Sequence, residues 1–498
     1  MEKANTWLSR LLYIVAGIYI LAFIATAIMR MGYPFELEWQ EGAIVDHCVK
    51  ALNGYPLYVK PTMAFVPNIF TPLYYYISAN VMGLTGTGFL APRVVSTVSI
   101  LVSAFFIFAS VWRLTGRKTG AFLSAAILIA AFNFTGCWYD LAHVDSLYLF
   151  MLSAAVYCML RKSSSFSAIA SVLFALAYFT RQTAIVTIGF AFLYYLFYNR
   201  KQLITFVIPG AALFFILSYI FYNSSGGWYY YYAIKLFFGH PGDYSKFLTF
   251  WADIFIGGAL IPVLIFIYFH IRKKDIPELY YREEAWPLYF ITAGMLIESL
   301  FTNAHYGATG NAAFPLIAGA SIVLGYSFDG LKRLSQDKKP MGFTVAIIAV
   351  FLQFAIFFYP PHKKVPAKPD RQAGEEFISL LKGIEGNVYI RDHGYYNRLA
   401  GKDTFAHSAA VQNVIISADI EYGGLNPAHT LRNEMIRRLA HGHFDAVILD
   451  NRFAFPEDSL VSAFYTLQDG VFENNHEFYP VSGPQYRPEI LFFKSERK

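Results

Sequence analysis

The stretch LLYIVAGIYILAFIATAIMRMGYPFELEWQEGA, residues 11–43, sets the class of this protein because a long apolar run ends in a cluster of carboxylates. Its apolar part covers residues 11–31, and a helix needs roughly 20 such residues to cross a hydrocarbon core of about 30 Å. Glu36, Glu38 and Glu41 follow within a few positions. The stretch therefore predicts a membrane-spanning helix that leads directly into an acidic loop at the membrane surface.

The composition extends this prediction to most of the chain. Of 498 residues, 56% are hydrophobic, 18% aromatic and only 15% charged, which is far from the average soluble domain. The formal net charge is +6, but the basic residues form short clusters between apolar runs. Such clusters are typical of topology signals in a membrane protein. We therefore expect membrane lipids around the chain and no nucleic acid partner.

The positions of the basic clusters predict how the chain crosses the membrane. A cluster follows every second apolar run, which places the N-terminus inside and the tail beyond Tyr359 outside. About eleven spans follow: 11–31, 91–112, 119–136, 145–160, 166–180, 183–198, 203–222, 254–270, 286–302, 312–328 and 341–359.

Three regions follow from this topology. Residues 1–359 form the transmembrane domain, whose first outer loop, 32–90, contains a tyrosine-rich segment that we expect to lie as a helix in the outer interface. The proline- and lysine-rich stretch 360–370 reads as a linker. Residues 371–498 read as a small α/β domain, with strands at VYIRDH and DAVILD and helices at 373–382 and 430–441. It carries no recognisable catalytic motif, and from its position we expect it to cover the site or to bind an acceptor.

The outer loops also contain the residues that could carry chemistry. A carboxylate beside an apolar wall can serve as a general base, so Glu41 and Glu38 are candidates, although acidic residues are common in exposed loops. In FTGCWYDLAHVDSLYLF, Asp140 and Asp145 flank His143. These three could contact a substrate or a divalent cation, but Asp145 could equally cap the next helix.

Two further outer loops add candidates. Arg181, in FTRQTA, is an arginine outside the membrane and suits a lipid-linked phosphate, or alternatively a lipid headgroup. His305, Tyr306 and Asn311 lie in FTNAHYGATGNAAFPL, where glycines let the backbone approach a ligand. A lone histidine in such a loop is also compatible with a purely structural role.

Several motifs of the first loop resemble the GT-C superfamily of membrane glycosyltransferases, in particular the protein O-mannosyltransferase and aminoarabinose transferase group. The matching elements are EGAIVDHCVKALNGYPLY, FTPLYYYISANVMGLTG and APRVVS. They place Glu41-Gly42, Gly54 with Tyr58, Pro72-Leu73 and Arg93 where that group has its acidic pair, its glycine and tyrosine, its interfacial helix and its arginine. Gln40 is a departure, because the group usually has Asp before the second acid.

The resemblance implies a GT-C fold and an inverting transfer of a sugar from a polyprenyl-phosphate donor to a hydroxyl of a lipid, glycan or protein. Glu41 would be the base, with Glu38 or Asp145 as rivals. No metal would be required, although a cation at Asp140 and Asp145 stays possible. The remaining roles are donor phosphate binding by Arg181, Arg93 and Lys60, and substrate contacts by Trp39, Tyr58, Asp140, His143, His305, Tyr306 and Asn311.

The expected location is the inner membrane of a bacterium, with the active site and the C-terminal domain on the extracytoplasmic side. Two other functions stay open at this point: a transporter or flippase of lipid-linked sugars, and a non-catalytic assembly subunit. Transporters usually carry ionisable residues at mid-membrane depth. Glu298, in the middle of an apolar run, is the one candidate of that kind that we single out.

Overall fold

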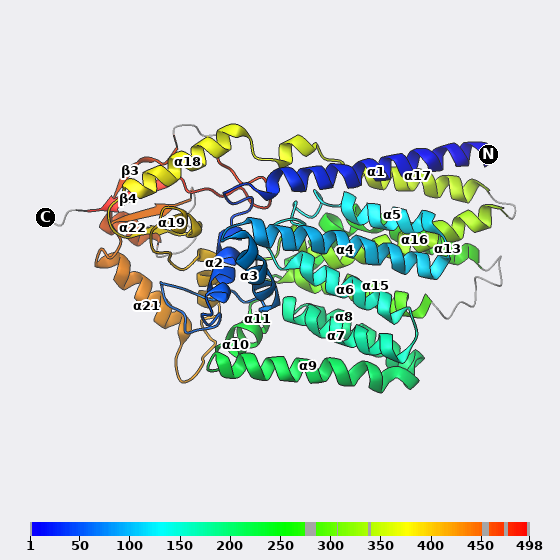
Figure 1. The fold of residues 1–498 in the computed structure, drawn as a ribbon, viewed down its shortest axis with the longest axis horizontal. Helices are drawn as coiled ribbons and strands as arrows, with labels where there is room; N and C mark the ends of the chain where they lie inside the picture. Colours follow the sequence, from blue (N-terminus) through cyan, green and yellow to red (C-terminus); the bar gives the residue numbers. More distant parts are fainter. Residues whose placement is uncertain are drawn as a thin grey trace.

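The computed structural model describes residues 2–273, 285–305, 307–336, 340–450, 458–472 and 477–495. Figure 1 shows long helices side by side in a bundle, with a small α/β domain at one end of it. The N-terminus lies at the opposite end of the bundle. Short helices fill the space between the bundle and the domain.

Each of the eleven predicted spans overlaps a helix in the described part of the chain, although the bounds differ by several residues at some ends. These helices are α1 (Glu2–Met31), α4 (Leu90–Thr115), α5 (Lys118–Ala130), α6 (Asp145–Met159), α7 (Ser164–Thr180), α8 (Ala184–Tyr198), α9 (Leu203–Ser224), α13 (Leu260–Arg272), α15 (Trp286–Ala304), α16 (Phe314–Gln336) and α17 (Pro340–Ile356).

The lengths of these helices vary widely. Among the described residues, four helices are long and apolar enough to cross a membrane alone, or six if each of two bent pairs counts as one span. The chain is thus a mostly helical membrane protein, while the eleven-span topology stays a prediction. Helix α5 is short because residues 131–144 leave it as a buried, irregular segment. Non-helical backbone is tolerated at membrane depth where protein surrounds it.

Helix α16 forms the centre of the bundle, and its apolar stretch is entirely buried. Its small residues allow close packing: a Cβ on Gly325 would lie 2.4 Å from the carbonyl oxygen of Gly120 on α5. The short helix η6 (Gly310–Ala313) precedes α16 directly and is buried as well. The central helix therefore fixes the position of Asn311.

Two helices of the first loop, α2 (Glu41–Leu52) and α3 (Leu73–Thr85), lie between the bundle and the C-terminal domain (Figure 1). With 13 residues, α3 rises only about 20 Å and is too short to span a membrane. Further short helices follow α9: α10 (Trp228–Tyr230), η2 (Tyr231–Leu236), α11 (Phe237–Gly239), α12 (Ser245–Phe250) and η3 (Trp251–Ile256).

The C-terminal region contains a four-stranded mixed sheet with the order β1-β2-β4-β3. Strands β1 (Val388–Ile390) and β2 (Ala446–Leu449) are parallel and coincide with the predicted strands. Strands β3 (Tyr465–Gly470) and β4 (Ile490–Lys494) run antiparallel and were not predicted. The helices of this region are α18 (Lys368–Gly383), α19 (Tyr395–Leu399), α20 (Ser408–Ile415), α21 (Pro427–Ala440) and α22 (Asp458–Phe464).

Candidate active site

Asp145, the first residue of α6, gathers three of the polar side chains singled out from the sequence. Its Oδ2 lies 2.5 Å from Nδ1 of His143 and accepts a hydrogen bond of 3.0 Å from the Asn311 amide. Its Oδ1 accepts a hydrogen bond from Arg181. The alternative prediction, in which Asp145 caps its helix, is wrong: the helix cap is Val144, and the carboxylate makes side-chain contacts instead.

A cavity of about 310 Å³ opens beside this cluster, where the bundle, the first loop and the C-terminal domain meet. Five residues predicted for the site line it: Trp39, His143, Arg181, His305 and Asn311. The domain contributes Ala409, Gln412, Asn413, Pro484 and Tyr486 to the wall. The C-terminal region therefore closes one side of the cavity.

Arg181 follows α7 and brings a cation with spare hydrogen-bond donors to this wall. The side chain is buried, and within the described residues it makes one hydrogen bond, to Asp145. A guanidinium carries five N–H donors, so most of them are available to a ligand. The Tyr148 ring lies 5.7 Å from the guanidinium carbon and helps to hold its position.

Glu41 lies outside the cavity wall and is saturated with hydrogen bonds. Arg93 donates to both of its oxygens, from Nε at 3.0 Å and from Nη2 at 2.6 Å. The backbone N–H groups of Leu37 and Ala142 each donate another bond of 2.7 Å. A carboxylate that accepts four bonds has no lone pair left for an acceptor proton. This geometry favours a positioning role for Glu41 over the predicted role of base.

The same Arg93 ties the first loop to the bundle. Besides Glu41, it donates to the carbonyl oxygens of Tyr33, at 2.6 Å, and Phe35, at 2.7 Å. None of these contacts faces the cavity. Arg93 is therefore placed as a structural cation rather than as the predicted phosphate ligand.

Asp140 is held by a second buried arginine, Arg30, near the end of α1. Nε of Arg30 donates a bond of 2.6 Å to Asp140, and Nη1 donates one of 2.9 Å to Ser482 of the C-terminal region. Asp140 and Asp145 are thus neutralised by different arginines. Among the described residues, no group of three His, Cys, Asp or Glu side chains is arranged to hold a metal ion.

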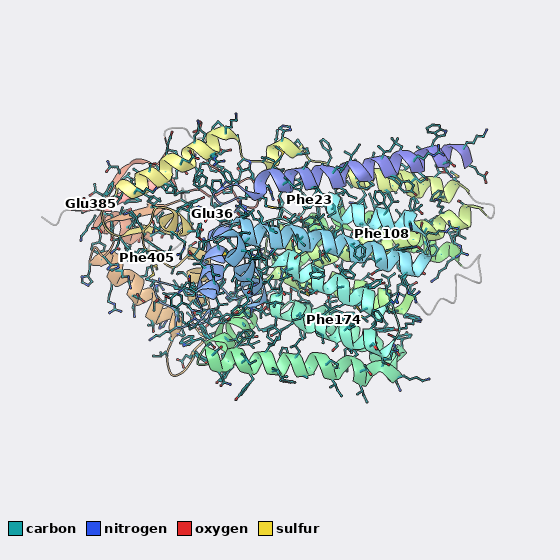
Figure 2. All side chains as sticks on the ribbon, viewed as in Figure 1. Phe23, Glu36, Phe108, Phe174, Glu385 and Phe405 are labelled. Atoms are coloured by element: carbon teal, nitrogen blue, oxygen red, sulfur yellow. The ribbon has the colours of Figure 1, made fainter. Side chains whose placement is uncertain are left out.

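The other two glutamates of the loop are buried against the C-terminal domain. Figure 2 shows Glu36 where the bundle meets that domain, and its carboxylate contacts Nδ1 of His393. Burial raises the pKa of Glu36 to about 7. Burial and the nearby Glu41 and Glu36 carboxylates also raise the pKa of Glu38 well above its ordinary range. Glu38 does not line the cavity.

The remaining predicted residues lie around the site or away from it. Lys60 is exposed and does not line the cavity. Tyr58 is buried and does not line the cavity, but its hydroxyl donates a bond of 2.6 Å to the carbonyl oxygen of Phe70, which does. Nε2 of His305 lies 3.1 Å from the Phe237 carbonyl oxygen. Tyr306 lies outside the described residues.

A family model and solved structures match this chain. Residues 67–224 match the model described as dolichyl-phosphate-mannose-protein mannosyltransferase. The structure of ArnT from Cupriavidus metallidurans bound to undecaprenyl phosphate superposes with a TM-score of 0.62 at 12% identity, over 96% of this chain and 97% of that one. The chain has the GT-C fold. This confirms the resemblance seen in the first loop.

Two more structures show the same GT-C architecture. ArnT in the apo state gives a TM-score of 0.58 at 11% identity, over 98% of both chains. The oligosaccharyltransferase from Archaeoglobus fulgidus in complex with Zn and sulfate gives 0.51 at 10% identity, over 95% of this chain and 73% of that one. No curated protein sequence matches the chain.

Within this GT-C fold, the sequence did not indicate several residues of the wall. Gln40, Trp138, Thr183 and Thr302 line the cavity from four different segments. Trp138 could have been found from its position in the same loop as His143. The contributions of the C-terminal domain carry no local signal, because they depend on contacts between residues far apart in the sequence.

Proposed function

We propose that this protein is a glycosyltransferase that moves a sugar from a polyprenyl-phosphate donor to an acceptor hydroxyl at the extracytoplasmic face of a bacterial inner membrane. The observation that carries the proposal is Arg181, a buried cation with free donors in the wall of a cavity at one end of a membrane bundle. Breaking the sugar–phosphate bond leaves negative charge on the phosphate. A fixed cation lowers the barrier by stabilising that charge.

A comparison of three buried arginines at this end of the bundle supports the assignment of Arg181 to the donor phosphate, because they differ in how many hydrogen bonds they donate to the protein. Arg30 and Arg93 each donate five hydrogen bonds to protein atoms within the described chain. Arg181 donates one. A charge-assisted bond to phosphate is about twice as strong as a neutral one, so Arg181 is the cation that a donor can use.

An apolar groove provides a place for the polyprenyl chain. It has a volume of about 420 Å³ and lies between α7, α8 and α9. Tyr178 on α7 and Ile185 on α8 line it, and Arg181 lies between them in the chain. A lipid tail in this groove would place its phosphate near Arg181. The ArnT relative was solved with undecaprenyl phosphate bound, which is a lipid of this class.

The proposed reaction inverts the anomeric carbon in one displacement, without a metal ion. The sugar would lie in the 310 Å³ cavity, beside the Trp39 ring. Asp140 and Asp145 are both paired with arginines, so neither offers a free carboxylate to a divalent cation.

Glu298 does not favour the transporter alternative. Its two oxygens accept bonds of 2.5 Å each from Tyr148 and Thr187, so this buried carboxylate is satisfied within the bundle. A helix-to-helix contact explains its presence at that depth. We therefore propose a single function.

The test of the donor site is binding of undecaprenyl phosphate to detergent-solubilised protein. Arg181→Met should weaken binding by about 1.5–3 kcal/mol, the typical value of a hydrogen bond to a charged group. Arg181→Lys should weaken it less, because the charge is kept. Arg161→Met, at an exposed arginine between α6 and α7, is the matched control and should bind like wild type. Equal affinities for the Arg181→Met and Arg161→Met proteins would remove Arg181 from the donor site.

A further inference from the structure

Transfer to a hydroxyl requires a base, and the carboxylates predicted for this task do not face the cavity. Glu41 accepts four hydrogen bonds from protein donors. Glu38 is buried away from the wall. Gln40 does line the cavity, but an amide is not a base. The proton of the acceptor hydroxyl must therefore go to another residue of the wall.

His143 has the geometry of a base. Its side chain is 3% exposed and lines the cavity, with its Nδ1 edge turned to Asp145. Nε2, on the other edge of the ring, is buried and has no hydrogen-bond partner in the part of the chain that the structure describes. A buried polar atom without a partner is costly, so its presence in a cavity wall points to a ligand.

The surroundings of His143 fix both the ring and its tautomer. Trp138 and Phe70 contact the imidazole edge to face, with centroid distances of 4.8 Å and 5.1 Å. The Asp145 carboxylate can only accept, so Nδ1 carries the proton and Nε2 carries the lone pair. A base that is oriented by a carboxylate on its far nitrogen recurs in hydrolytic enzymes.

We propose that His143 is the general base of the transfer and that Asp145 is its positioning residue; this inference rests on the proposed function. Nε2 of His143 takes the proton from the acceptor hydroxyl as the acceptor oxygen forms its bond to the anomeric carbon. The bond from that carbon to the phosphate oxygen breaks, and its electron pair leaves with the polyprenyl phosphate. The imidazolium is stabilised by Asp145 and returns its proton to water.

Asp145 contacts both the proposed base, His143, and the proposed phosphate ligand, Arg181. One carboxylate oxygen contacts His143 and the other accepts from Arg181, so base and phosphate-binding cation flank the same part of the cavity. Besides Arg181, the wall has two further titratable side chains, Tyr486 and His305, and Nε2 of His305 faces the Phe237 carbonyl. His143 is therefore the histidine of the wall that is paired with a carboxylate and whose Nε2 has no partner among the described residues.

The experiment measures release of undecaprenyl phosphate from a panel of undecaprenyl-phosphate-linked pentoses and hexoses by the full-length protein, with lipid A present as the hydroxyl acceptor. His143→Ala should lower kcat roughly 100- to 10,000-fold, the usual contribution of general base catalysis, and leave the donor KM within a few fold. Added imidazole should restore part of the lost rate. His429→Ala, at an exposed histidine of α21, is the control and should behave as wild type with or without imidazole.

A wild-type rate in His143→Ala would overturn this inference, and so would a loss of rate that imidazole does not restore in folded protein. His143→Asn, which keeps a polar side chain at this position but has no basic nitrogen, gives a second test and should lose as much rate as His143→Ala. A wild-type rate in His143→Asn would also overturn it. If the wild type releases no lipid phosphate from any donor, the proposed function fails, whereas activity without dependence on His143 refutes the base alone.

Discussion

At the scale of single residues, buried charges at one end of the bundle divide into those that hold the fold and those that face the cavity. Arg30 with Asp140, and Arg93 with Glu41, are side-chain pairs at most 1% exposed that tie separate segments together. Removing one partner of such a pair leaves an uncompensated buried charge. The acidic loop is therefore partly a structural feature, and only its neighbours Trp39 and Gln40 reach the cavity.

Glu41→Gln should lower stability far more than it lowers turnover of the folded fraction. Breaking a buried ion pair costs about 3–5 kcal/mol, because the Arg93 cation stays buried without its partner. The measurement is thermal unfolding of the purified protein in detergent. Glu385→Gln, at an exposed glutamate labelled in Figure 2 at the far end of the C-terminal domain, is the control and should unfold as wild type. An unchanged unfolding temperature with abolished turnover would return the role of base to Glu41.

At the scale of elements, the turn between α7 and α8 connects an apolar groove with a polar cavity. Arg181 ends α7 in an extended conformation, and α8 begins at Ala184. The groove residues lie on both helices and on α9, where Phe206 and Phe214 close the far side. One short turn therefore places the buried guanidinium of Arg181 between two helices that line an apolar groove.

Filling the groove should weaken donor binding without unfolding the bundle. A Cβ added at Gly189 on α8 would meet nothing within 4 Å, so Gly189→Trp projects its ring into the groove. We expect the donor KM to rise roughly tenfold, which corresponds to about 1.4 kcal/mol. Gly17→Trp is the matched control, because Gly17 on α1 is equally open and lies away from the groove. Equal KM values for the two variants would exclude the groove as the site of the polyprenyl chain.

The elements also show which parts of the structure could be predicted from the sequence. Apolar runs predicted the helices of the bundle, because local hydrophobicity determines them. Strands β1 and β2 were visible for the same reason. Strand β3 was missed because YTLQDG has no continuous apolar run, whereas the ILFF run of β4 is a local signal from which that strand could have been predicted. The segment of α3 was separated from a spanning helix by the alternation of the basic clusters, since counting it as a span would invert the placement of every later cluster.

In the candidate site, too, residues with a local sequence signal could be predicted, whereas contacts between distant segments could not. His143 was singled out because Asp140 and Asp145 flank it, and Arg181 because an arginine outside the membrane departs from the usual inside bias. Asn311 was singled out because glycines in its loop let the backbone approach a ligand. The partners of Glu41 and Asp140 were not predictable, since Arg93 and Arg30 approach them from other helices.

At the scale of the whole molecule, the C-terminal domain docks onto the first loop through buried polar contacts. His393 contacts Glu36, and its Nε2 lies 3.4 Å from an Asp450 oxygen. Nε2 of His407 lies 3.1 Å from the Trp39 carbonyl oxygen, and Arg398 contacts Asp46 at 2.8 Å. These contacts hold the domain over the cavity, so docking and the shape of the site depend on each other.

Docking should weaken as the pH rises. Burial lowers the pKa of His393, but the Asp450 and Glu36 carboxylates raise it further, well above its ordinary value. A raised histidine pKa stabilises the folded form fully below about pH 6.5 and loses that effect as the pH rises through the folded-state value. Glu36, with its pKa near 7, acts in the same direction because its proton is lost on the way up.

The measurement is the unfolding temperature between pH 6 and pH 9. It should fall with rising pH in the wild type, and the slope should be smaller in His393→Phe. His362→Phe, at an exposed histidine of the segment before α18, is the control and should keep the wild-type slope. A wild-type slope in His393→Phe would show that this cluster does not link docking to pH.

The most direct test of the account is sugar transfer by the purified protein in liposomes, with undecaprenyl-phosphate-linked sugars as donors, lipid A as acceptor and a chelator present. We expect one new glycosidic bond of inverted anomeric configuration for each undecaprenyl phosphate released, and loss of both products in Arg181→Met but not in Arg161→Met. Movement of the lipid-linked sugar across the bilayer with no lipid phosphate released would contradict it.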